Sequence, residues 1–253
     1  MTDTIHDVDQ KLEARTGWAR IAQGAGIAIV VWAIVTHIVA RVPIPPVIVI
    51  GIVFGAFVPF LNGRRRKLGL VYAILGVLAL LGNLPAIAGE LVRPESSPAF
   101  ILTLFSTLAV IVIAVAGFGV FFGYSAVPAR ALALGATAVF VVGATVSAVV
   151  ALNTPSDTAA AGDIEVISEK VEFLPDVIST DAGTVGVWVD NRDGIHHTFT
   201  IEALDVDLEI PALKAKRVDF EAPAGTYDVI CTVPGHESMT ATLLSLIHIS
   251  EPT

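Results

Sequence analysis

Five long apolar stretches dominate the first 152 residues of this chain. They cover residues 20–40, 44–61, 68–89, 99–123 and 131–152. Each is close to the roughly 20 residues that a helix needs to cross a bilayer core about 30 Å thick. Segments in lipid must be helical, because every backbone N–H and C=O needs an internal partner. We therefore expect a membrane region over residues 20–152 with about five transmembrane helices, preceded by a cytoplasmic tail over residues 1–19.

The second stretch is the shortest, and prolines at 43, 45 and 46 precede or open it. A tilted or re-entrant segment is the alternative there. The mean hydropathy of +0.76 and the 15% of charged residues exclude an ordinary soluble enzyme and a disordered chain.

Basic residues in the loops predict the orientation of these helices. They lie in the N-terminal tail and at its boundary with the first stretch, after the second stretch and after the fourth: Lys11, Arg15, Arg20, Arg64, Arg65, Arg66, Lys67 and Arg130. The N-terminus is therefore expected in the cytoplasm, and five crossings would leave the C-terminal part outside the cell membrane. The first stretch is too long for a cleavable signal peptide and has four more spans after it.

The apolar stretches carry little chemistry of their own. Away from their ends, His37 is the one Asp, Glu, Lys, Arg or His residue within them, and an interfacial histidine is a plainer interpretation than a functional one. Asn83 and Pro85 predict a kink in the third helix. Small residues favour close helix packing, namely Gly24, Gly26, Gly51, Gly55, Gly135, Ala136 and Gly143. The region is interpreted as an anchor or a docking platform.

Charge divides the chain into two parts. Residues 1–154 hold 10 Lys/Arg and 6 Asp/Glu, a net charge of +4, whereas residues 155–243 hold 5 and 17, a net charge of −12. A nucleic-acid partner is not expected, because the water-soluble part has the wrong sign. The single cysteine excludes a disulfide framework, a four-cysteine zinc site and a binuclear copper site. A small, polar linker over residues 153–162 joins the two parts.

Residues 163–243 are expected to form an all-β sandwich or barrel. Apolar and polar residues alternate around Val187, Phe199 and Val229, which is the pattern of half-buried strands. Turn signals separate the strands at residues 181–183, 191–194, 223–225 and 234–235.

A metal site is predicted from one short segment of this β part. Cys231-Thr-Val-Pro-Gly-His236-Glu-Ser-Met239 places three soft or borderline ligand types within nine residues. Ile195-His196-His197-Thr-Phe adds an upstream imidazole. Two histidines, one cysteine and a weak axial methionine are the ligands of type 1, or blue, copper sites. Zinc would gain nothing from a thioether.

These motifs resemble those of the cupredoxins, the azurin- and plastocyanin-like blue copper proteins. The Cys-Thr-x-Pro-Gly-His segment is similar to that of azurin, and Asn191-x-Asp-x-x-x-His197-Thr-Phe-Thr resembles the strand that carries the first histidine. The resemblance implies a Greek-key β-sandwich over residues 163–243, one type 1 copper ion and one-electron transfer. The implied metal ligands are His197, Cys231, His236 and Met239, with His236 the solvent-facing imidazole.

Two positions depart from the pattern of the family. Two residues separate His236 from Met239, whereas azurins have three, although a spacing of two occurs elsewhere in the family. Thr198 follows the first histidine, where an asparagine that bonds across the site is common.

The choice between His196 and His197 rests on strand alternation. His197 shares a face with Phe199 and Ile201, the apolar set expected to point inward, so His197 is the predicted ligand. His196 is interpreted either as a surface histidine or as a residue that controls access near the metal.

Three functions are compatible with these sequence features. The leading one is a non-enzymatic electron carrier, tethered to the lipid bilayer, whose acidic domain attracts a redox protein with a basic docking face. The alternatives are copper delivery without redox turnover and a structural subunit of a larger membrane complex. No small-molecule substrate is expected, because a single site without an open position has none.

The last ten residues, Leu244 to Thr253, resemble the translation of a sequencing adapter. They are expected to be an artefact that replaces the natural end of the last strand, and His248 is therefore not expected to be a ligand.

Overall fold

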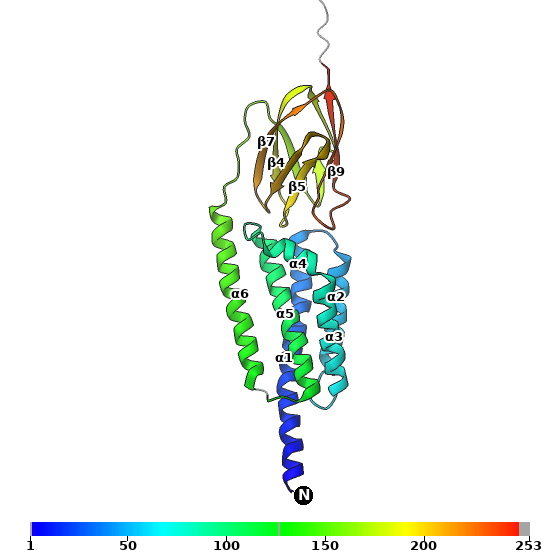
Figure 1. The fold of residues 1–253 in the computed structure, drawn as a ribbon, viewed down its shortest axis with the longest axis vertical. Coiled ribbons are helices and arrows are strands. Elements are labelled where there is room, and N and C mark those ends of the chain that lie inside the picture. Colours follow the sequence, from blue (N-terminus) through cyan, green and yellow to red (C-terminus); the bar gives the residue numbers. More distant parts are fainter. Residues whose placement is uncertain (1, 126, 248–253) are drawn as a thin grey trace, which may run out of the picture. The chain divides into compact units, whose positions relative to one another are not determined.

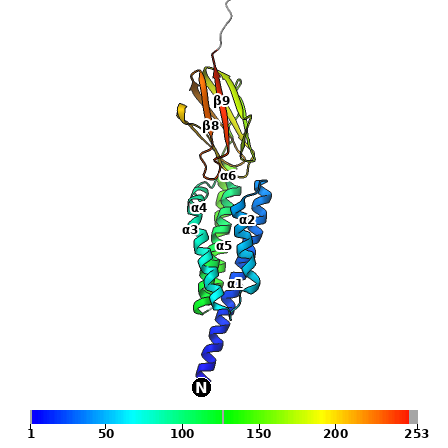
Figure 2. The same cartoon turned by 90° about the vertical axis from the view of Figure 1, so that its right-hand side faces the viewer.

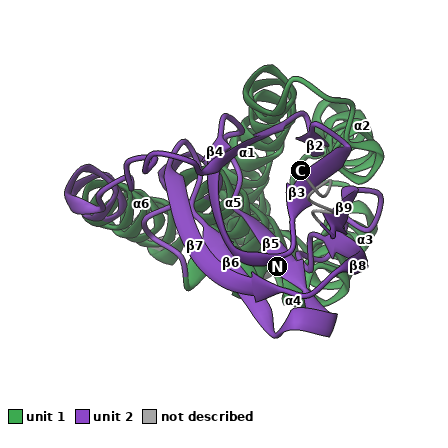
Figure 3. Ribbon diagram, turned by 90° about the horizontal axis from the view of Figure 1, so that it is seen from above, with its two compact units in different colours: residues 1–92, 100–146 green, residues 93–99, 147–253 purple. Residues whose placement is uncertain are grey.

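The computed structural model describes residues 2–125 and 127–247, and they divide into two compact units (Figure 3). The first comprises residues 1–92 and 100–146, and is helical. The second comprises residues 93–99 and 147–253, and contains all the described strands.

The helices follow the apolar stretches of the sequence (Figure 1). In chain order they are α1 (Thr2–Ala40), α2 (Pro45–Phe57), the 3₁₀ turn η1 (Val58–Phe60), α3 (Arg66–Gly82), α4 (Leu84–Leu91), α5 (Ser97–Phe122) and α6 (Val127–Asn153).

Three of the described helices are long and apolar enough to cross a membrane, over Val8–Ala40, Ser97–Phe122 and Pro128–Asn153. A fourth span is obtained if α3 and α4 are taken as one broken segment. Their axes differ by 62° at Asn83, which confirms the predicted kink. The stretch at 44–61 folds as the shorter apolar helix α2 with η1, so a count of five spans stays a prediction.

Small residues bring α1 and α2 together, as predicted. Gly51 and Gly55 lie one turn apart on α2, and a Cβ atom at either would lie under 3.0 Å from Ala33 or Val30 of α1. A Cβ atom at Gly26 would likewise come too close to Tyr72, and one at Gly143 too close to Leu104. Added Cβ atoms at Gly24 and Gly135 would have no neighbour within 4 Å. Packing through small residues is therefore real for part of the predicted set only.

His37 closes the connection between α1 and α2. Its Nδ1 lies 2.7 Å from the carbonyl of Ala33, and its Nε2 accepts the N–H of Ile44 at 3.1 Å. Both ring nitrogens therefore have backbone partners, which supports the structural interpretation of this histidine.

The second unit is a sandwich of two sheets (Figures 1 and 2). One sheet has the order β2-β1-β4-β7, and the other has the order β3-β9-β8-β5-β6. The strands are β1 (Ile164–Glu169), β2 (Glu172–Leu174), β3 (Val177–Asp181), β4 (Gly183–Asn191), β5 (His197–Ile201), β6 (Val206–Ile210), β7 (Ala215–Ala222), β8 (Gly225–Ile230) and β9 (Thr240–Leu246). A 3₁₀ turn, η2 (Glu202–Leu204), joins β5 to β6.

The core of the sandwich forms from the alternating residues predicted to point inward. Val185, Val187 and Val189 of β4 are at most 3% exposed. The rings of Phe173 on β2 and Phe199 on β5 meet edge to face, with centroids 5.8 Å apart, and so join the two sheets. All four predicted turn segments lie at or within the connections between strands, which confirms the all-β prediction.

Strand β5 departs from simple alternation, because both of its faces are buried. Thr200 hydrogen-bonds Asp207 of β6 at 2.8 Å, so its hydroxyl is satisfied without solvent. This doubly buried strand carries His197 as its first residue.

The segment predicted as a linker lies along β7. Asp157 donates its N–H to the carbonyl of Ala215 at 2.9 Å and accepts the N–H of Arg217 at 3.0 Å. The carbonyl of Asp157 also accepts the indole N–H of Trp188 at 2.8 Å. At the other end of the chain, Leu244–Leu246 pair with β3, whereas residues 248–253, including His248, lie outside the described residues.

Candidate metal centre

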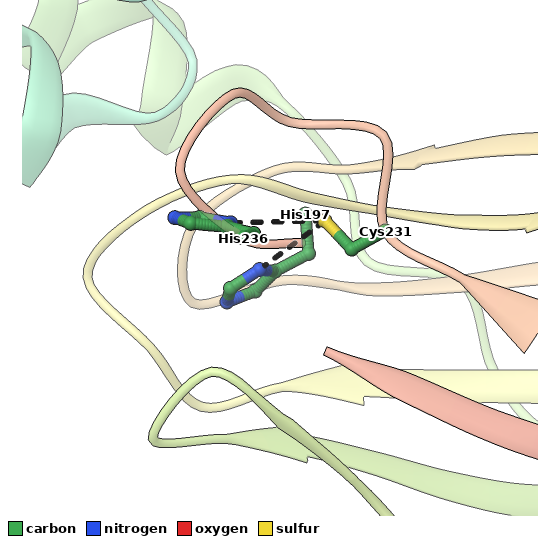
Figure 4. Close-up of side chains that lie close together, drawn as sticks. All are labelled: His197, Cys231 and His236. Atoms are coloured by element: carbon green, nitrogen blue, oxygen red, sulfur yellow. Dashed lines mark hydrogen bonds between the residues drawn. The ribbon is translucent and has the colours of Figure 1, made fainter. Parts of the chain in front are cut away.

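Three of the predicted ligands converge at one end of the sandwich (Figure 4). His197 opens β5, whereas Cys231 and His236 lie in the loop between β8 and β9. Their ligand atoms all lie within 4.8 Å of one another. Nδ1 of His197 lies 3.8 Å from the Cys231 sulfur, and Nδ1 of His236 lies 3.7 Å from it. Both imidazoles therefore turn the same type of nitrogen toward the thiol.

The loop from Cys231 to Met239 is closed by its own backbone. Cys231 donates its N–H to the carbonyl of Met239 at 3.1 Å, and Met239 donates to the carbonyl of His236 at 2.8 Å. Gly235 adopts a φ of +91°, which a residue with a Cβ rarely tolerates. Its N–H also donates to the Glu237 carboxylate at 2.9 Å. The Pro-Gly turn thus sets the position from which His236 faces the sulfur.

Met239 is fully buried and belongs to the same core cluster as Cys231. Its backbone bonds to Cys231 and His236 hold it at the end of the loop. Its role as an axial ligand stays a prediction.

Thr198 joins the first ligand strand to the ligand loop. Its N–H donates to the Cys231 sulfur at 3.4 Å, and its hydroxyl oxygen accepts the N–H of Thr232 at 2.8 Å. The two threonine hydroxyls are also 3.0 Å apart. Thr198 therefore bonds across the site, which is the role given above to the asparagine common at this position.

Asp193 holds the outer edge of His197. Its Oδ2 lies 2.9 Å from Nε2 of His197, and the side chains of the pair are 10% and 0% exposed. The carboxylate also accepts the N–H of Lys170 at 2.8 Å and that of Val171 at 3.0 Å. Asn191 in turn accepts the N–H of Asp193 at 2.9 Å.

The residues that hold Asp193 have an unusual backbone. Lys170 and Val171 have φ values of 58° and 62°, a region that β-branched residues avoid. The tight connection between β1 and β2 thus adopts a costly conformation in which two N–H groups meet one carboxylate. The sequence contained Asp193 in its motif but gave no signal for these two partners, which lie more than 20 residues away.

His196 is 4% exposed, so the interpretation of a surface histidine is wrong. Strand β5 begins one residue later, and the chain between Asn191 and His197 is folded inward by side-chain bonds. Its ring is not part of the cluster formed by His197, Cys231 and His236.

The cluster lowers the pKa of its thiol. Burial raises the pKa of Cys231, but hydrogen bonds from His197, His236 and the N–H of Thr198 outweigh burial and lower the pKa to about 5. Burial also acts on His197, yet its bonds to Asp193 and Cys231 raise its pKa. For Asp193, burial is again outweighed, and the bond to His197 lowers the pKa.

The donor set and its burial fit copper. A thiolate suits Cu(I), imidazole suits Cu(II), and the three donor atoms already lie close together. His197 is fully buried and Cys231 is 6% exposed, whereas His236 is partly exposed between exposed neighbours. One imidazole edge is therefore open to solvent while the thiol is shielded.

Comparison with known proteins supports this description. The family model of the cupredoxin-like domain matches residues 141–244. No curated protein matches the chain.

Solved structures that match part of this chain include an oxidised mutant of amicyanin, with 21% identity and a TM-score of 0.31, covering 36% of this chain and 90% of that one. A reduced mutant of amicyanin is 24% identical with a TM-score of 0.31, and the match covers 36% of this chain and 91% of that one. A copper-containing nitrite reductase from Thermus scotoductus SA-01 gives 19% and 0.30, covering 39% of this chain and 26% of that one.

The family match and the geometry agree on the same part of the chain. The matched residues include His197, Cys231, His236 and Met239. The C-terminal β-sandwich of this protein is therefore a cupredoxin-like domain with a His–Cys–His group placed to hold copper.

Proposed function

We propose that the protein is a membrane-anchored type 1 copper protein that carries single electrons. The observation that carries this proposal is the convergence of two Nδ1 atoms on the sulfur of Cys231, at 3.8 and 3.7 Å. When bound, copper would supply a one-electron couple at this site. His197, Cys231, His236 and Met239 would hold it.

The burial of the ligands favours electron transfer over copper delivery. Delivery requires a partner to reach the ligands and exchange them, yet His197 and Met239 are fully buried. Electron transfer requires only an exposed path to the metal, and the partly exposed His236 supplies one. Shielding also limits the rearrangement that accompanies each change of oxidation state. We assign no catalytic reaction to the domain.

The apolar helices support membrane anchoring. The basic residues near Arg64–Lys67 favour a cytoplasmic N-terminus, and with five crossings the copper domain would lie on the extracytoplasmic side. The net charge of −12 over residues 155–243 favours a redox partner with a basic docking face. Electron exchange with such a partner should slow as ionic strength rises.

The test is the optical and EPR spectrum of the purified full chain after addition of Cu(II). We expect an intense blue absorption band and narrow copper hyperfine splitting, since a short copper–thiolate bond produces both. Cys231→Ser and His197→Ala should abolish the blue band. His196→Ala is the matched control, because it removes a neighbouring buried imidazole that lies outside the cluster.

A colourless or ordinary Cu(II) spectrum from a folded chain would contradict the type 1 site. Rapid loss of copper to a chelator, with no reversible redox couple, would favour delivery instead. Loss of the band in His196→Ala but not in His197→Ala would reverse the assignment of the first histidine.

A further inference from the structure

A cavity of about 150 Å³ lies inside the helical unit, between α1, α2, α3, α4 and α5. Most of its wall is aliphatic, from residues such as Ile50, Leu80 and Val110. The polar residues that line it are Trp32, Asn83, Glu90, Thr103, Ser106 and Thr107. One of them, Glu90, is ionisable, and an ionisable residue in such a wall is uncommon among apolar helices and points to a function.

Two of these polar groups are not satisfied by the chain. Nε1 of Trp32 and Oγ1 of Thr107 are buried and have no hydrogen-bond partner among the described residues. Their neighbours differ, because Ser106 donates to the carbonyl of Thr103 at 3.1 Å and Asn83 donates to that of Ala79 at 2.8 Å. A buried donor without a partner is destabilising, because it has lost its hydrogen bond to water and gained none. The two donors belong to different helices, α1 and α5, that line the same cavity.

The chemistry of the two donors defines what would satisfy them. An indole N–H only donates, so its partner must be an acceptor oxygen or nitrogen. Donors on two helices match a ligand with acceptors at more than one position. The aliphatic wall selects an apolar body, and an apolar cavity of about 150 Å³ holds a single six-membered ring.

We infer that this cavity binds the ring of a lipid-soluble quinone. Trp32 and Thr107 donate to its carbonyl oxygens, and the aliphatic residues of α2, α3 and α5 contact its ring. Such a ligand reaches the helices from the surrounding lipid. The inference concerns binding alone, and it does not depend on the copper site.

Calorimetric titration of the full chain in phosphatidylcholine nanodiscs, with ubiquinone-1 as the probe and empty nanodiscs as the blank, tests the inference. We expect one saturable site. Thr107→Val removes one donor at nearly constant volume and should weaken binding about fivefold. Trp32→Phe should weaken binding to a similar extent, and Ala79→Phe, which fills the cavity, should abolish it.

Thr145→Val is the matched control, because the hydroxyl of Thr145 is satisfied by the carbonyl of Val141 on its own helix, α6. Its affinity should equal that of the wild type. Each variant must elute as the wild type does and keep the helical signal of its circular dichroism spectrum, which separates a folding defect from a lost site. Equal affinity in Thr107→Val and in the wild type would overturn the inference. So would equally tight binding of p-xylene, a ring without acceptors, or uptake that never saturates.

Discussion

The Nε2 atom of His197 lies 2.9 Å from Oδ2 of Asp193, and the histidine of this pair is fully buried. The opposite nitrogen of the same ring faces the sulfur of Cys231. One imidazole thus connects a carboxylate held by Lys170 and Val171 to the predicted metal position. Partners of this kind fix the ring orientation of a metal ligand and raise its basicity.

Removing the charge of Asp193 should raise the reduction potential of the copper site. A more basic histidine stabilises Cu(II) relative to Cu(I), and Asp193→Asn keeps the shape but loses the charge. A tenfold change in the ratio of the affinities of the site for Cu(II) and Cu(I) corresponds to a shift of about 59 mV in the potential of a one-electron couple. Redox titration of the blue band measures the shift. Asp219→Asn, an exposed charge on β7, serves as the control for net charge alone, and an equal shift there would refute a specific role for Asp193.

Thr198→Val should loosen the ligand loop without removing any ligand. The hydroxyl oxygen of Thr198 accepts the N–H of Thr232, and its loss leaves that N–H without this hydrogen-bond acceptor. We expect the β domain to lose about 1 kcal/mol of unfolding free energy. The midpoint of urea unfolding of the metal-free chain is the measurement. Thr226→Val changes an exposed threonine of β8 and should leave the midpoint in place.

The metal-free chain should hold a thiolate at neutral pH. The pKa of Cys231 is lowered to about 5, because the hydrogen bonds of His197 and His236 outweigh burial. Thiolate absorbance near 240 nm should therefore appear as the pH rises through about 5. In His197→Ala the same absorbance should appear at higher pH, nearer the ordinary value of about 8.5. Cys231→Ser identifies the signal, and a midpoint unchanged by His197→Ala would exclude the histidine as its cause.

The ion pair of Asp163 with Arg217 should make the domain less stable in acid. Hydrogen bonds from Arg217 and from the N–H of Ala160 lower the pKa of Asp163, and the two side chains are 2.6 Å apart. The contribution is fully present above the ordinary carboxyl pKa of about 3.9 and is lost as the pH falls through the lower folded pKa.

Asp163→Asn should therefore flatten the dependence of unfolding free energy on pH below about 5. Urea unfolding of the metal-free chain at a series of pH values gives this slope. Asp176→Asn, at an exposed carboxylate between β2 and β3, is the comparison. If both variants keep the slope of the wild type, another group causes the loss of stability in acid.

The strand pattern was enough to predict the sandwich and to place His197, rather than His196, in one group with Cys231 and His236. Alternation works there because one face of a strand must point into the core. It failed to predict that His196 is buried too, because that burial depends on the folding of residues 191–197 as a turn. The helix lengths were less predictable, since composition marks an apolar stretch without fixing where the chain bends.

The hydrogen bonds that hold Asp193 in place could not be predicted from the sequence, for a different reason. Asp193 meets Lys170 and Val171 only because β1 pairs with β4, and local patterns do not report a pairing between distant segments. The same applies to the cavity, where Trp32 and Thr107 are 75 positions apart. Glu90 directly follows the apolar stretch 68–89, and its place in the cavity wall follows from the bend at Asn83.

The contacts of Ser156 and Asp157 with β7 limit where the chain can be truncated to give a β-domain fragment. Strand β7 is at the edge of its sheet, and Ser156 and Asp157 occupy the hydrogen-bonding groups of Ala215 and Arg217 on its open side. A fragment that starts at residue 163 would leave these backbone N–H and C=O groups of β7 unpaired, and such an exposed edge pairs with strands of other molecules. A fragment that starts at Pro155 keeps the edge covered and should stay monomeric where the shorter one aggregates.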